Sequence, residues 1–332
     1  MDAMFWTIAV IVVLALSFDF INGFHDTANA IATSVSTRAL TPRQAIVLAS
    51  VMNLLGALLF TGVAKRIADG IVDPFGLQDG LNVVIATLIA AIVWNLITWW
   101  YGIPSSSSHA LIGSLAGAGL AAEGIGGINF GGFGKIVTAL VVSPLVAFAA
   151  GFAIMFVFKH VFANFAPYKL NKAFRSGQVL SAAFQAFTHG TNDAQKAMGI
   201  ITLALVFAGY QQQVEVAAWV KISAALAMAA GTAMGGWKII KTMGTKIFKI
   251  EPINGFSADF GSATVILSAT LTHLPVSTTH VITSSILGVG SAKRFSAVKW
   301  GVAGRIVLAW FITIPVSAAL AAVTYGILSM FR

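Results

Sequence analysis

Long apolar stretches separated by short polar segments run along the whole chain. A transmembrane helix needs about 20 consecutive, mostly apolar residues. Shorter apolar segments follow two prolines, at 109–122 and 281–292. The stretches near or above the required length are 4–21, 44–63, 81–103, 136–158, 179–208, 215–236, 258–274 and 305–329. A transmembrane barrel would instead show segments of about ten residues with alternating polarity. The pattern therefore predicts an all-α polytopic membrane protein.

The composition narrows the class of protein further. Of 332 residues, 58% are hydrophobic and 9% are charged, whereas a soluble domain carries about 25% charged residues. So few charges cannot cover a soluble globule, which excludes an ordinary soluble enzyme and a disordered chain. The absence of cysteine excludes disulfides and thiolate chemistry. We attribute the net charge of +9 to basic cytoplasmic loops rather than to nucleic-acid binding.

Two motifs recur in the same order at an offset close to half of the chain. Residues 22–30 (NGFHDTANA) match 189–197 (HGTNDAQKA), since both place a glycine three residues before an aspartate and an alanine four residues after it. Residues 104–113 (PSSSSHALIG) match 275–284 (PVSTTHVITS). Chance explains such an ordered pair of matches poorly, so we predict an internal repeat.

The loop charges indicate that the two repeats have opposite orientations. In each of three equivalent pairs, one loop is basic and the other is neutral or acidic. With the basic member first, the pairs are 38–43 with 205–214, 238–251 with 65–79, and 293–305 with 123–135. Because basic loops stay on the cytoplasmic side, equivalent loops lie on opposite faces of the membrane. Such inverted-topology repeats are the plan of many secondary transporters.

This orientation rule also predicts the topology and the domain organisation. Segments 81–122 and 256–291 each start and end on one face, so we expect two helical hairpins that turn near Pro104 and Pro275. We expect about 10–12 transmembrane helices in the cell membrane, which is the inner membrane in cells that have two membranes. Both termini are expected on the external side of this membrane. The predicted units are a first repeat (1–158), a short basic cytoplasmic linker (159–178) and a second repeat (179–332).

Two aspartates at equivalent positions of the repeats are the first candidates for chemistry. Asp26 and Asp193 lie within apolar segments, where an ionisable side chain is costly and is a functional candidate by default. Asn22 and Asn29 flank Asp26, and Asn192 precedes Asp193. Carboxylate and amide oxygens suit Na⁺, H⁺ or a divalent metal. We therefore predict a cation-coupling site, and the alternative is a helix-packing motif.

Hydroxyl side chains at the two hairpin turns are candidates for anion binding. A helix N-terminus offers free N–H groups and the positive end of its dipole, and hydroxyls add donors without a buried charge. We predict that these residues and Asn192 bind a tetrahedral oxyanion at the midplane, and the alternative is simple N-capping. The hydroxyl residues are Ser105, Ser106, Ser107, Ser108, Ser277, Thr278 and Thr279.

A buried lysine and two matched histidines are candidate charge or proton partners. Lys196 breaks the repeat, because its counterpart is Asn29. Pairing with Asp193 at i,i+3 is the favoured interpretation, with attraction of the anion as the alternative. His109 and His280 follow the hydroxyl clusters of the two hairpins. A histidine can relay protons near neutral pH, although a membrane histidine is more often a packing residue.

Together, these motifs resemble the inorganic phosphate transporter (PiT) family over the whole chain. The resemblance implies a secondary phosphate transporter in which the motif aspartates serve cation coupling and the hairpin hydroxyls bind phosphate. Sodium-coupled relatives tend to carry an acidic residue where Asn53 stands and asparagine where Lys196 stands. The chain therefore resembles the bacterial low-affinity branch, which moves phosphate with protons or as a neutral metal–phosphate complex.

Our leading hypothesis is a transporter, not an enzyme, that imports inorganic phosphate by cation symport with alternating access around a midplane site. Coupling by protons or by metal–phosphate is favoured over sodium, and the sequence leaves the metal undetermined. Its partners are phosphate, the coupling cation and lipid, with no cofactor beyond the co-transported cation and with a homodimer left open. The alternatives are a sulfate permease, a passive channel and an intramembrane aspartyl protease, for which the hairpins would have no role.

Overall fold

The computed structural model describes residues 3–72 and 79–331, and within these residues it is helical, with no β-strand. The longer helices are α1 (Ala3–Ser36), α2 (Pro42–Ala57), α3 (Gly62–Gly70), α4 (Gly80–Tyr101), α5 (Ser107–Glu123), α6 (Phe130–Val161), α7 (Pro167–Asp193), α8 (Gln195–Phe207), α9 (Ala218–Met234), α11 (Pro252–Leu271), α12 (Thr278–Lys293) and α13 (Trp300–Ser329). Short elements are α10 (Trp237–Lys241), a π-turn (Thr242–Lys246) and two 3₁₀ turns (Gly124–Gly127 and Phe295–Ala297). Part of the predicted loop 65–79, residues 73–78, lies outside the described residues.

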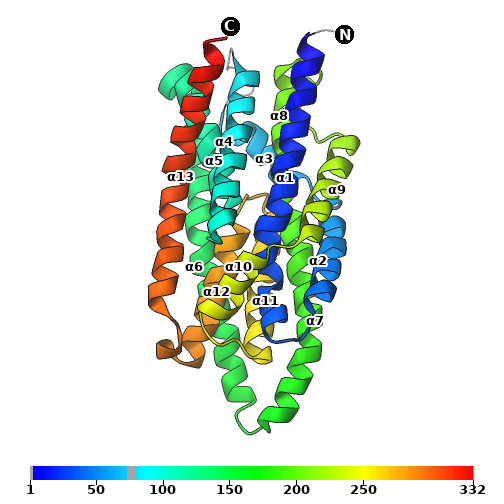
Figure 1. Cartoon of the computed structure of the whole chain (residues 1–332), viewed down its shortest axis with the longest axis vertical. Coiled ribbons are helices and arrows are strands. Elements are labelled where there is room, and N and C mark those ends of the chain that lie inside the picture. Colours follow the sequence, from blue (N-terminus) through cyan, green and yellow to red (C-terminus); the bar gives the residue numbers. More distant parts are fainter. Residues whose placement is uncertain (1–2, 73–78, 332) are drawn as a thin grey trace.

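The helices form one elongated bundle (Figure 1), in which the start of α1 and the end of α13 lie at the same end. The α6–α7 turn lies at the opposite end. Five described helices are long and apolar enough to cross a membrane, or seven spans if each of two bent pairs counts as one. Large apolar side chains on the outer faces, such as Leu145 on α6 and Phe311 on α13, are exposed, as expected for surfaces that meet lipid. The chain is an all-helical membrane protein, as predicted.

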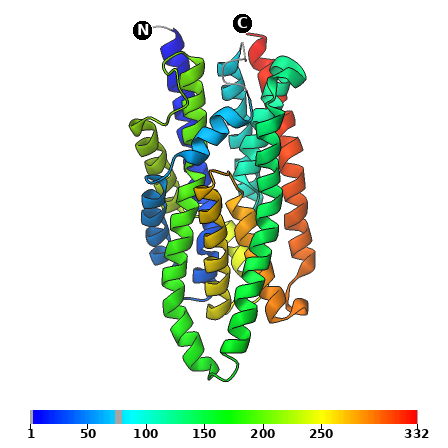
Figure 2. The ribbon, with the colours of Figure 1, turned by 180° about the vertical axis from the view of Figure 1, so that it is seen from behind.

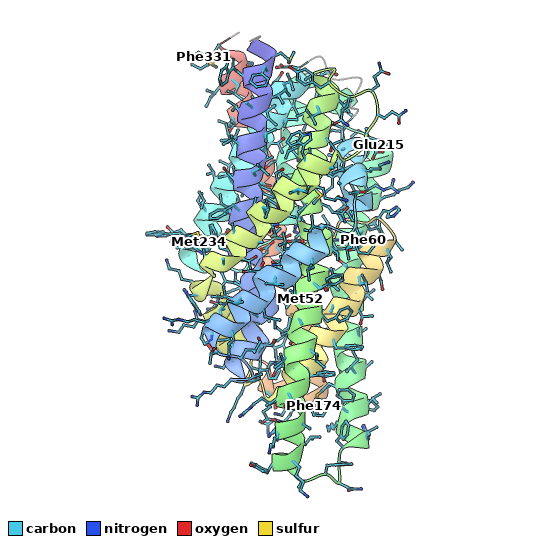
Figure 3. The ribbon with its side chains drawn as sticks, turned by 90° about the vertical axis from the view of Figure 1, so that its right-hand side faces the viewer. Met52, Phe60, Phe174, Glu215, Met234 and Phe331 are labelled. Atoms are coloured by element: carbon cyan, nitrogen blue, oxygen red, sulfur yellow. The ribbon has the colours of Figure 1, made fainter. Side chains whose placement is uncertain are left out.

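The order of helices in the second half repeats that of the first. The pair α2–α3 is bent by 69° and the pair α9–α10, with its π-turn, by 62°. Figure 3 shows these two breaks, marked by Phe60 and Met234, at a similar height on opposite sides of the bundle. The long helices α6 and α13 each contain one proline, Pro144 and Pro315, at equivalent positions. These shared irregularities agree with the repeat predicted from the motifs.

Two helical hairpins enter the bundle from opposite ends, as predicted from the loop charges. Helices α4 and α5 run from the end with the termini to mid-height and back, whereas α11 and α12 do so from the other end (Figures 1 and 2). Gly102 ends α4 in the left-handed region, with φ 64°, and the chain then turns through Pro104. The second hairpin turns through residues 272–277. The two tips therefore face each other near the middle of the bundle.

Each hairpin packs against the long helix of the other repeat, α5 on α13 and α12 on α6. Glycines allow these helix backbones to approach closely. A Cβ on Gly117 of α5 would overlap the carbonyl oxygen of Ala318, and a Cβ on the equivalent Gly288 of α12 would overlap that of Phe148. Because the neighbouring atoms belong to helix backbone, neither can move aside easily. The two repeats are thus interlocked rather than placed side by side.

Gly288→Leu is expected to destabilise the protein by about 3 kcal/mol or more, because overpacking against a backbone forces the two helices apart. Thermal unfolding of the detergent-solubilised protein measures this effect. The matched control is Gly304→Leu, because a side chain at Gly304 on α13 meets open space. Equal melting temperatures for the two variants would contradict the close contact between α6 and α12.

A polar layer separates two apolar cores. One core contains the first half of α1 with α3, α4, α5, α8 and α9, and the other contains the end of α1 with α2, α7, α10, α11 and α12. Between them, polar side chains from both sequence motifs and both hairpin tips are buried. Buried polar groups at this depth need internal partners. This layer is therefore where the candidate residues interact.

Three predicted elements differ from the observed ones. The predicted span 44–63 is broken at residues 58–61, and the predicted span 179–208 is two helices separated at Ala194. With these breaks and the five-residue α10, the described residues form 13 α-helices, not all of which are long enough to cross a membrane. The predicted linker 159–178 is reduced to the loop 162–166, because α7 begins at Pro167. Apolar periodicity does not reveal such breaks, since the flanking residues stay apolar.

Candidate functional site

The two hairpin tips meet directly. Ser108, in the first turn of α5, donates a hydrogen bond from Oγ to the backbone carbonyl of Val276, 2.8 Å away, in the opposite tip. The hydroxyl residues of both tips are at most 1% exposed. The N-termini of α5 and α12 therefore lie together in the polar layer, as the sequence predicts.

Asp26 of α1 links the two repeats through its carboxylate. It accepts a hydrogen bond of 2.5 Å from Ser107 of the first hairpin and one of 3.0 Å from Thr279 of the second. The neighbouring His25 ring places Nδ1 2.7 Å from Oδ1 of Asp26, and its Nε2 lies 3.1 Å from Thr98 Oγ1. Because Asp26 is 1% exposed, these protein groups replace water around its charge.

Asp193, at the end of α7, lies in an equivalent arrangement. Its Oδ1 is 2.9 Å from the ammonium of Lys196, which lies in the first turn of α8. Its Oδ2 accepts a 3.1 Å hydrogen bond from Thr278 and lies 3.4 Å from Nε2 of His189. Lys196 also donates a 3.0 Å hydrogen bond to Ser107. The i,i+3 pairing predicted for Lys196 is therefore present.

The two halves of this cluster are related by the repeat but differ in charge. Ser107 on Asp26 and Thr278 on Asp193 are equivalent contacts from equivalent hairpin positions. The strongest partner of Asp193 is a lysine, whereas that of Asp26 is a histidine. With both aspartates ionised and Lys196 protonated, the cluster carries a net negative charge when His25 is neutral. A further buried anion would therefore add to the electrostatic cost of this cluster.

The remaining hydroxyls of the tips fix the hairpins. Ser106 accepts a hydrogen bond from the N–H of His109, and Ser277 accepts one from the N–H of His280. Both are N-caps, which is the alternative stated for the hydroxyl clusters. Ser105 donates to Thr98 at 2.8 Å. Of the seven predicted hydroxyls, Ser107, Thr278 and Thr279 contact the carboxylates.

The three predicted asparagines have different surroundings. Asn29 donates from Nδ2 to Thr279 at 2.9 Å, and its buried Oδ1 has no hydrogen-bond partner in the described chain. Asn192 holds the second tip, because it donates to the carbonyl of Leu274 and accepts from the N–H of Val276. Asn22 is fully buried and lies next to Asp19 on α1. Of the three asparagines, Asn29 is the one that a single hydroxyl, that of Thr279, links to Asp26.

His109 and His280 are brought together, but on the outer side of the hairpins. Their ring centroids are 4.3 Å apart, and the His280 ring stacks on Trp310 at 3.9 Å. Both line a mostly apolar cavity of about 370 Å³ that also contacts Phe148. Neither makes a described hydrogen bond or ion pair with Asp26 or Asp193. Their place fits the packing alternative better than a direct proton relay.

Asn53 of α2 belongs to a buried network beside the site. It donates from Nδ2 to Thr27 of α1 and Thr232 of α9, both at 2.9 Å, and its Oδ1 lies 3.1 Å from Nδ1 of His189. The chain thus holds His189 through an uncharged side chain at this position. The asymmetry in charge between the halves is not offset by a further acid here.

A further buried aspartate, Asp259 of α11, is not among the residues predicted from the sequence. It accepts hydrogen bonds from Thr33 at 2.6 Å and from Ser181 at 3.2 Å. A buried acid in the apolar stretch 258–274 was the signal that could have found it. Among residues 3–72 and 79–331, no group of three or more His, Cys, Asp and Glu side chains could hold a metal ion.

Repeated, oppositely oriented helical units with charges buried where two hairpins meet define a polytopic membrane transporter. The family model "Phosphate transporter family" matches residues 22–169 and 163–321. The chain belongs to this family. The two matched segments correspond to the two halves of the fold. The family consists of transporters rather than enzymes, so the aspartyl protease alternative is excluded.

Several relatives match along their full length. A protein of Bacillus subtilis (strain 168), named "Probable low-affinity inorganic phosphate transporter", is 57% identical over 99% of both chains. A protein of Rhizobium meliloti (strain 1021) with the same name is 46% identical over 95% of this chain and 94% of its own. The solved structure titled "The sodium-dependent phosphate transporter" matches with a TM-score of 0.89 and 27% identity, covering 98% of this chain and all of that one. These matches support phosphate transport by this chain.

Proposed function

We propose that the chain imports inorganic phosphate across the cell membrane by symport with a cation. One observation carries the proposal. The two hairpin tips bring Ser107, Thr278 and Thr279 onto a pair of buried aspartates, with a buried lysine between them. The relatives named as phosphate transporters support the same substrate.

Phosphate would bind where the N-termini of α5 and α12 converge. Their hydroxyls and positive dipole ends favour an oxyanion. In the present arrangement these hydroxyls donate to the carboxylates, so an entering anion must share them. A phosphate that carries a proton near pH 7 can itself donate a hydrogen bond to a carboxylate, whereas sulfate cannot. The acidic lining therefore favours phosphate over sulfate.

The charge of the site supports cation coupling. Asp26, Asp193 and Lys196 together leave one negative charge uncompensated, and a phosphate anion would add at least one more. Moving these charges through a membrane requires a compensating cation. We favour a proton, or a metal carried as a metal–phosphate complex, over sodium, because Lys196 already occupies one carboxylate and Asn53 adds no further negative charge.

The orientation of transport follows from the charges of the loops. We place both termini outside and the loops 37–41, 162–166 and 294–299 in the cytoplasm, because the residues in and beside these loops are strongly basic. The two repeats would then expose the site alternately to each side, with the hairpin tips separating and closing around it.

Uptake of radiolabelled phosphate into proteoliposomes tests this proposal. We expect accumulation above the external concentration when the outside is made acidic, and collapse of that accumulation when a protonophore dissipates the gradient. Unlabelled sulfate should compete weakly. Downhill uptake alone would indicate a channel, and faster carriage of sulfate than of phosphate would indicate a sulfate permease. A gradient of divalent metal at constant pH distinguishes metal–phosphate from proton coupling.

A further inference from the structure

Lys196 is a cation built into the site. Its side chain is 1% exposed, and its ammonium contacts Asp193 Oδ1 at 2.9 Å and Ser107 Oγ at 3.0 Å. Ser107 in turn donates to Asp26 at 2.5 Å. The ammonium is therefore held by oxygens of both repeats at the point where the hairpin of the first repeat meets the aspartate of the second.

The equivalent position in the other repeat shows what this lysine replaces. Asn29 follows Asp26 by three residues, as Lys196 follows Asp193. Asn29 donates to Thr279, which donates to Asp26, whereas Lys196 contacts Asp193 directly and donates to Ser107, which also donates to Asp26. In the first repeat this chain contains a neutral amide whose Oδ1 is buried without a partner. In the second repeat the same place carries a fixed positive charge.

Carboxylate, hydroxyl and amide oxygens are the kind of ligand set that a hard cation prefers. The Asp26 half keeps that set, made by Asp26, Asn29 and Thr279. In the Asp193 half, the ammonium of Lys196 lies against the carboxylate and fills the same role. Because the ammonium is covalently attached, it cannot leave with the substrate.

We propose that Lys196 is a tethered substitute for a coupling cation, which makes the Asp193 half independent of sodium and leaves the Asp26 half as the place of the mobile cation. This inference rests on the proposed cation symport and specifies it. It makes Lys196 a specificity-determining residue: the ammonium provides one compensating charge for phosphate without consuming an ion gradient. Removing it should re-create a place for sodium at Asp193.

The experiment is direct binding of radiolabelled sodium to the purified protein without phosphate. We expect Lys196→Asn, which copies the residue of the first repeat, and the longer Lys196→Gln to bind one more sodium ion at saturation than the wild type binds. Lys196→Arg, which keeps the charge, should gain none. Lys135→Asn, at an exposed position on α6, is the matched control. A monodisperse Asn or Gln variant that binds no more sodium than the wild type would overturn the proposal.

Phosphate uptake gives a second readout. The ratio of uptake with sodium to uptake with choline is taken within each variant, so differences in the amount of folded protein cancel. Replacing choline with sodium outside should raise uptake by Lys196→Asn about tenfold more than it raises uptake by the wild type, within the range typical of coupling between two bound ligands. An equal response of the two proteins to sodium overturns the proposal. If Lys196 instead binds phosphate directly, the variant raises the KM for phosphate and still ignores sodium. Sodium binding needs no phosphate, so the inference can fail while phosphate transport holds.

Discussion

Asp26→Asn is expected to abolish uphill accumulation of phosphate. Asp26 is the carboxylate without a lysine partner, and it accepts hydrogen bonds from both hairpins. An amide cannot carry the negative charge that a coupling cation needs. Removing one partner of a buried charge pair typically weakens binding by about 2–5 kcal/mol, so we expect gradient-driven uptake to fall by about a hundredfold or more. Phosphate uptake under an imposed pH gradient measures the effect.

The exposed Asp69→Asn serves as the control for this variant, because the Asp69 side chain lies at the surface of α3. It should retain wild-type accumulation. Phosphate exchange at equal concentrations and equal pH on both sides adds a second readout, since exchange needs binding and closure but no net ion movement. If Asp26→Asn accumulates phosphate to the wild-type level under the gradient, Asp26 has no part in coupling.

The sequence predicts the architecture well because the bilayer imposes strict rules. The two hairpins and their opposite orientations follow from where basic loops fall, and the helical hairpins are observed at 80–123 and 252–293. The motif comparison also predicts that Asp26, Asp193 and the hairpin hydroxyls meet, because an inverted repeat brings equivalent segments to a common centre. The i,i+3 contact of Lys196 with Asp193 follows from helix periodicity alone.

The roles of individual hydroxyls could not be predicted in the same way. Ser105 to Ser108 are four consecutive residues of one chemical type, yet one is an N-cap, one contacts Asp26, one bonds to the other tip and one bonds to Thr98. Their roles depend on the angle at which the chain enters α5, which the sequence pattern does not contain. Likewise, the matched positions of His109 and His280 suggest a proton relay, but the His109 ring packs on the His280 ring, which stacks on Trp310.

The missed Asp259 shows another limit. It lies at the start of an apolar stretch, where an acid is easily assigned to the membrane boundary. In the structure, α11 enters the bundle beside α1 and α7, so Thr33 and Ser181 surround the carboxylate. Depth in the bundle depends on packing between distant helices. The local pattern records only that the neighbouring residues are apolar.

Cross-linking the two hairpin tips is expected to lower the rate of phosphate uptake about tenfold or more. The proposed alternating access requires the tips to move relative to the site. Ser108 and Val276 lie on opposite tips and are joined by one 2.8 Å hydrogen bond. The natural chain has no cysteine, so the double variant Ser108→Cys with Val276→Cys would carry the only two thiols. A short bifunctional thiol reagent should join them.

The two single-cysteine variants, treated with the same reagent, are the controls for modification without a cross-link. Phosphate uptake should be lost in the double variant alone and should return when a reducing agent cleaves a disulfide-linked reagent. Mass spectrometry of the digested protein verifies the bridge between the two tips. If fully cross-linked protein still transports phosphate at the rate of the reduced protein, the tips stay together during the cycle. The site must then open somewhere other than between the two tips. The alternative is an opening between the hairpins and the helices α1, α7 and α8, which carry Asp26, Asp193 and Lys196 respectively.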